Sequence, residues 1–180
     1  MEKVFQGNSW ARRYMTRVTL VKGMSWGLLG GLVGTMVMDL VLMGGLSAVG
    51  LPALTCFSIV GDTAARFLLM LGIELAGGIP VGVAAHYLVG PVVGIIFGAA
   101  VVQIKALRID SLKKGVIFAV LYVEILSQPL LAMTPLLLPM TSADILQWFG
   151  LSFVMHLIYG VVLGAVVSYG LGLATTAIHR

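Results

Sequence analysis

Charged residues are scarce in this chain. Asp, Glu, Lys and Arg together make up 10% of its 180 residues, whereas hydrophobic residues make up 59%. A soluble domain carries about 25% charged residues. So few charges cannot cover a surface that faces water. The composition therefore predicts one compact domain embedded in a lipid bilayer.

Cysteine and enzyme motifs are scarce as well. Cys56 is the only cysteine, so the chain cannot form an internal disulfide. The sequence has no serine nucleophile motif, no HExxH pair and no phosphate-binding loop. We therefore expect no catalytic residues. The net charge of +4 does not indicate nucleic-acid binding, because the basic residues flank apolar segments and form no patch interleaved with aromatic residues.

Four apolar segments are long enough to cross a bilayer, which takes about 20 residues. They cover residues 24–49, 80–104, 115–138 and 150–174. Ten of the eleven Lys and Arg residues fall on one side of these four spans, and only Arg66 falls on the other. Because basic loops stay in the cytoplasm, the pattern predicts a multi-pass protein of the plasma (inner) membrane with both termini cytoplasmic.

The N-terminal segment, residues 1–23, has the pattern of an amphipathic helix lying at the cytoplasmic face. Its basic side carries Arg12, Arg13 and Arg17, which we expect to contact anionic lipid head groups. A solvated basic lead-in explains the same residues equally well. Residues 175–180 form a short cytoplasmic tail in this scheme.

The outer loop, residues 50–79, is apolar but too polar to span. We expect an interfacial or partly re-entrant helix over residues 63–71, with Asp62 capping its start. Further along, Trp148 is expected at the level of the membrane interface. Together these segments predict a helix that covers the outer face of the bundle.

Two of the spans carry the same ladder of small residues below a histidine. Steps of four residues suit close helix packing of the small-xxx-small kind. With an offset of 70 residues, Gly82, His86, Gly90, Gly94 and Gly98 match Ser152, His156, Gly160, Gly164 and Ser168. The first and third spans match loosely. We predict a glycine-zipped four-helix bundle of two parallel two-helix repeats. The expected packing glycines are Gly27, Gly31, Gly34, Gly90, Gly94, Gly98, Gly160 and Gly164.

Six polar residues inside the spans form the candidate intramembrane site. An ionisable side chain at the bilayer centre costs about 2.5–3.5 kcal/mol on insertion scales, so it should face protein or water. Glu124, Ser127 and Gln128 share one helix face, which suits either a cation, proton or polar-solute site or an interhelical hydrogen-bond network. The six residues are Asp39, His86, Glu124, Ser127, Gln128 and His156.

His86 and His156 lie at similar depths in their spans, and three interpretations are open for them. They could bond other helices, through Asp39 or Glu124. They could form a protonatable relay, because histidine titrates near neutral pH. They could also ligate a metal or act as two axial ligands of a haem. No other cofactor is indicated.

The repeated HxxxGxxxG ladder, "GGLVGTMVMD" in the first span and "IVGDTAARF" in the outer loop resemble small four-span prokaryotic membrane proteins of uncharacterised function, the YagU-like group. The resemblance implies an integral inner-membrane protein over most of the chain. It supplies no active-site residues.

Three functions follow as hypotheses. The first is a non-catalytic subunit that packs within a larger membrane complex or with copies of itself, because the small faces exceed what four helices need. The second is a small transporter of protons, cations or polar solutes that uses the buried acids and histidines. The third is a haem- or metal-binding redox subunit.

Overall fold

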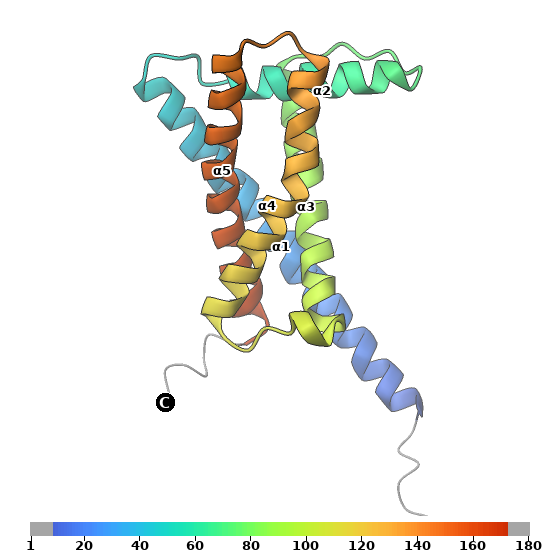
Figure 1. Ribbon diagram of the computed structural model, residues 1–180. Coiled ribbons are helices and arrows are strands. Elements are labelled where there is room, and N and C mark those ends of the chain that lie inside the picture. Colours follow the sequence, from blue (N-terminus) through green and yellow to red (C-terminus); the bar gives the residue numbers. More distant parts are fainter. Residues whose placement is uncertain (1–8, 173–180) are drawn as a thin grey trace, which may run out of the picture.

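The computed structural model describes the backbone of residues 9–172 and the side chains of residues 19–172, and this part of the chain is all helical (Figure 1). The helices are α1 (Ser9–Ala48), α2 (Thr55–Met70), α3 (Ile79–Gln103), the short 3-10 helix η1 (Lys105–Leu107), α4 (Leu112–Leu137) and α5 (Ser142–Gly170). The predicted tail, residues 175–180, lies outside the described residues.

Four of these helices are long and apolar enough to cross a membrane. They cover Thr19–Ala48, Ile79–Gln103, Leu112–Leu137 and Ser142–Gly170, so the four predicted spans are confirmed as helices of the required length and composition. α1 continues without a break from Ser9, and the predicted N-terminal segment is part of that helix from Ser9 onward. The side chains of Arg12, Arg13 and Arg17 lie outside the described part.

The fourth span begins earlier than expected because its start is capped. The Thr141 side chain accepts a hydrogen bond from the backbone N–H of Asp144, and the Asp144 carboxylate accepts one from the backbone N–H of Thr141. This reciprocal pair satisfies the free donors of the first turn and starts α5 at Ser142. α4 starts in a similar way, with Ser111 accepting from Lys114.

α2 corrects the sequence prediction for the outer loop. The helix begins at Thr55 rather than at residue 63, so Asp62 lies in its middle and does not cap its start. Instead the Asp62 carboxylate accepts a hydrogen bond from the backbone N–H of Gly78 at 2.7 Å. This bond ties α2 to the start of α3, and α2 lies across one end of the bundle (Figure 1). We call this the α2 end, and the opposite end the η1 end.

α1 is the central helix of the bundle. It packs against both α3 and α5, and α5 also packs against α4. α3 meets α4 mainly through Tyr122, whose hydroxyl donates to the carbonyl of Val93 at 3.1 Å. Along α3, a Cβ added to Gly90, Gly94 or Gly98 would collide with α1. The ladder therefore lets the two backbones approach closely. Its partners on α1 are Gly23, Gly27, Gly31 and Thr35.

The other small residues are used inside the chain too. Gly34 faces Tyr159 of α5, whereas Gly160 and Gly164 of α5 face Val120 and Val116 of α4. The surplus of small faces, on which the subunit hypothesis depended, is thus largely consumed by contacts within one chain.

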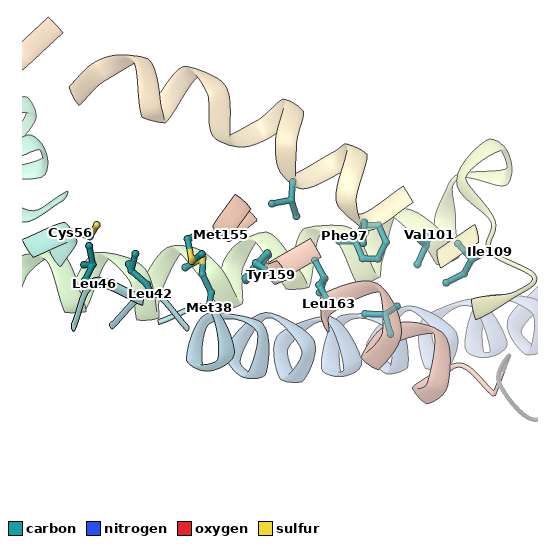
Figure 2. Packing of buried hydrophobic residues seen from close by; sticks show 13 residues of the cluster. Met38, Leu42, Leu46, Cys56, Phe97, Val101, Ile109, Met155, Tyr159 and Leu163 are labelled. Atoms are coloured by element: carbon teal, nitrogen blue, oxygen red, sulfur yellow. The ribbon is translucent and has the colours of Figure 1, made fainter. Parts of the chain in front are cut away.

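The buried hydrophobic cluster runs along α1 from the α2 end to the η1 end (Figure 2). Cys56 of α2 and Leu46 lie at one extremity of the cluster, and Val101 and Ile109 lie at the other. Between these extremities, Asp39 is a buried acid within the bundle. The candidate site lies at its depth.

Candidate functional site

Asp39 and His86 form a bonded pair between α1 and α3. The distance from Asp39 Oδ1 to His86 Nδ1 is 2.9 Å, and Asp39 is 4% exposed. The two helices come close just below, where Gly90 meets the side chain of Thr35. Since a carboxylate can only accept, His86 donates from Nδ1. This contact supports the hydrogen-bond interpretation for His86, with Asp39 as its partner.

The His86 ring is also held from the α2 end. The ring of Phe57 on α2 lies against it, with 5.1 Å between the ring centroids. Asp39 fixes one ring nitrogen while Phe57 restricts the tilt of the ring. As a result, the His86 ring has a defined orientation, and Nε2 is the ring nitrogen that Asp39 does not bond.

His156 reaches the same region from α5. Its ring lies near the backbone carbonyl of Ser152, and its buried Nδ1 makes no hydrogen bond of good geometry among the residues that the structure describes. The two histidines line the same two cavities. The smaller cavity, of about 110 Å³, lies among the four long helices. The larger, of about 430 Å³, lies beneath α2. The residues that border both cavities are Met38, His86, Val89, Leu130 and His156.

The larger cavity is mainly apolar, and most of its polar groups are already occupied. The hydroxyl groups of Thr63 and Thr134 lie 3.2 Å apart and bond each other. Burial, together with the charge of Asp39, raises the pKa of the Cys56 thiol to about 11, so this thiol stays protonated at neutral pH. The histidines are therefore the groups best placed to bond a molecule in this space.

Trp148, which the sequence placed at the membrane interface, is buried in the wall of the larger cavity. Its Nε1 donates to the backbone carbonyl of Leu131 at 3.1 Å. That carbonyl lacks its usual helical donor because the residue four positions later is Pro135, which has no N–H. Trp148 thus repairs the gap in α4 and holds the α2 end of α4 to α5.

The three polar residues of α4 do not form one site. The Glu124 carboxylate is buried, and neither of its oxygens has a hydrogen-bond partner in the described part of the chain. Ser127 is buried and lines the smaller cavity, whereas Gln128 is exposed on the outside of the bundle. The three residues of this helix face therefore have different surroundings.

Two residues of the site could have been found from spacing. Thr35 precedes Asp39 by one turn, and Tyr159 follows His156 by one turn. Both line the smaller cavity, and the Tyr159 hydroxyl donates to the carbonyl of Gly90 at 2.6 Å. Phe57 could not have been found, since it comes from a different element.

The described residues contain no group of three or more His, Cys, Asp or Glu side chains that could hold a metal ion. Comparisons with protein-family models, with curated proteins and with solved structures found no match to this chain. The resemblance to the YagU-like group stays a prediction. The function therefore has to be inferred from the geometry of the site.

Proposed function

We propose that this protein is an integral membrane protein that binds a small, mainly apolar molecule in its helical core, with an oxygen-bearing group of that molecule against His86 and His156. The observation that carries the proposal is the cavity of about 430 Å³ that ends at these two side chains. Ligand sites typically have volumes of about 300–1,000 Å³, with apolar walls and a few convergent polar groups.

The polar groups at the end of the cavity suit such a ligand. His86, held by Asp39 through Nδ1, offers Nε2 as an acceptor for a hydroxyl group. His156 offers a ring nitrogen without a partner in the described residues, which can donate to a carbonyl. Transport of cations or polar solutes has less support, because the cavity walls are mainly apolar and Glu124 does not line them.

We also propose how the two halves of the bundle are related and how the protein is oriented in the membrane. We infer two copies of one glycine-zipped helix pair, α1 with α3 and α4 with α5, related by the 70-residue offset of the histidine ladders. We place the protein in the inner membrane with both termini in the cytoplasm, because the basic residues favour that side. Arg12, Arg13 and Arg17 would then face anionic lipids.

A cavity-filling substitution tests the proposal. Ala85 lines the larger cavity, while its neighbour Ala84 is exposed on the outside of α3. Mass spectrometry of protein purified from native membranes in mild detergent should detect a bound apolar molecule in the unaltered protein and in Ala84→Phe. Ala85→Phe should lose most of it. Equal amounts in all three samples, or none in any, would refute ligand binding in this cavity.

A second candidate function, a subunit of a membrane complex or a homo-oligomer, is favoured by Gln128. Its amide lies on the exposed surface of a span, where lipid offers it no hydrogen-bond partner. An adjacent helix would provide one. In a Cys56→Ala background, Gln128→Cys should cross-link to another chain in native membranes. Leu40→Cys, equally outward on α1, serves as the control.

A further inference from the structure

The two helix pairs share one register. In the first pair, Gly94 of α3 meets Gly31 of α1, and one turn nearer the α2 end Gly90 meets Thr35. In the second pair, Gly164 of α5 meets Val116 of α4, and one turn nearer the α2 end Gly160 meets Val120. In both pairs, the step from one contact to the next is four residues on each helix.

The next turn toward the α2 end carries the polar residues. In the first pair this turn holds Asp39 and His86, which are bonded at 2.9 Å. In the second pair the same step from Val120 and Gly160 leads to Glu124 and His156. The register therefore places an acid opposite a histidine in both halves of the molecule.

The two helix pairs differ in whether the acid and the histidine are hydrogen-bonded to each other. Both Glu124 oxygens are buried without a hydrogen-bond partner in the part of the chain that the structure describes, and the Nδ1 of His156 is buried with no hydrogen bond of good geometry, although the His156 ring lies near the backbone carbonyl of Ser152. Buried polar atoms of this kind are normally bonded, and a buried carboxylate is costly without a partner. Three such atoms on facing turns point to an interaction between the two side chains.

We propose that Glu124 positions His156 as Asp39 positions His86, through a hydrogen bond from Nδ1 to the carboxylate that is open in this structure. The protein then has two acid–histidine pairs, one from each half, that hold both histidines at the shared wall of the cavities. This inference does not depend on the identity or presence of a ligand.

NMR of protein labelled with ¹⁵N-histidine tests the pairing. In a His179→Gln background only the two membrane histidines give signals. Glu124→Gln should shift the ring signals of His156 and leave those of His86 in place, and Asp39→Asn should do the reverse. Glu124→Asp, which shortens the acid, should restore the signals of His156 in part only. If Glu124→Gln leaves His156 unchanged, the proposal is wrong.

Disulfide formation in native membranes gives a second measurement that needs no purified protein. Cysteines bridge when their Cα atoms are about 5.5–6 Å apart, which only facing positions reach. In a Cys56→Ala background, the double variants Glu124→Cys/His156→Cys and Asp39→Cys/His86→Cys should both form an internal bridge. A bridge in the Asp39/His86 variant without one in the other would overturn the shared register. Loss of ligand binding with both bridges intact would instead count against the proposed function alone.

Discussion

α1 and α4 hold corresponding places in the two helix pairs, yet they have different surroundings. α1 contacts both α3 and α5, whereas α4 packs mainly on α5. Within the most apolar window of each helix, 44% of α1 is buried but only 22% of α4. The difference teaches that a shared contact pattern does not give a shared environment. Asp39 is enclosed and bonded, whereas Glu124 lies at the edge of a contact and Gln128 lies beyond it.

The largest predicted loss of stability comes from a side chain added at Gly94 of α3, and it should exceed the loss from the same change at Gly164 of α5. Gly94→Val would drive a side chain into the α1 backbone, and α1 cannot retreat because α5 packs on its other side. We expect a loss of about 3 kcal/mol, the upper end for overpacking. Gly164→Val would press on α4, which has room to shift, and should cost about 1 kcal/mol. Unfolding in mixed detergent micelles measures both, and equal losses would remove the contrast between the helices.

The two acids should also differ. Asp39→Asn weakens a buried bond to His86 and should lower the free energy of unfolding by about 1–3 kcal/mol. Glu124→Gln alters an acid whose proposed bond to His156 is open in this structure, so its loss should be smaller, below about 1 kcal/mol. The same unfolding assay at neutral pH measures both variants. A larger loss for Glu124→Gln would contradict this account.

Loss of the hydrogen bond from Trp148 to α4 should lower stability by a smaller amount, which depends on Pro135. Trp148→Phe keeps the ring but leaves the Leu131 carbonyl without a donor, at a cost of about 1 kcal/mol. In a Pro135→Ala background the helix supplies its own N–H, and the same substitution should cost much less. A double-mutant cycle isolates this difference. Additive effects would show that Trp148 does not act through this carbonyl.

The smallest effect is expected in the loop before α4. The hydrogen bond from Lys114 lowers the pKa of Asp110, so any stabilisation is present at neutral pH and is lost as the pH falls through the lowered value. Because Asp110 is fully exposed, solvent screens the pair. Asp110→Asn should therefore leave thermal unfolding in detergent unchanged at pH 7. A clear shift would mean that this loop fixes the position of α4.

Much of the fold could be predicted from local patterns. The four spans follow from the lengths of the apolar runs, and the bond between His86 and Asp39 was among the interpretations of the polar residues. The helix over Asp62 was misplaced because the residue bonds across space to Gly78 rather than to its own helix start. The burial of Trp148 could not have been predicted, because it depends on Pro135 of another helix, whose missing donor to the Leu131 carbonyl it replaces.

The sequence by itself determined that this protein consists of long apolar helices with small residues at four-residue steps, because span length and helix periodicity are local properties. Only the tertiary structure decided which acid meets its histidine, which polar side chain is left outside and where the cavities lie. Those outcomes depend on the separation of neighbouring helices. That separation is set by whether glycine or valine lies at each crossing and by which helices remain uncovered.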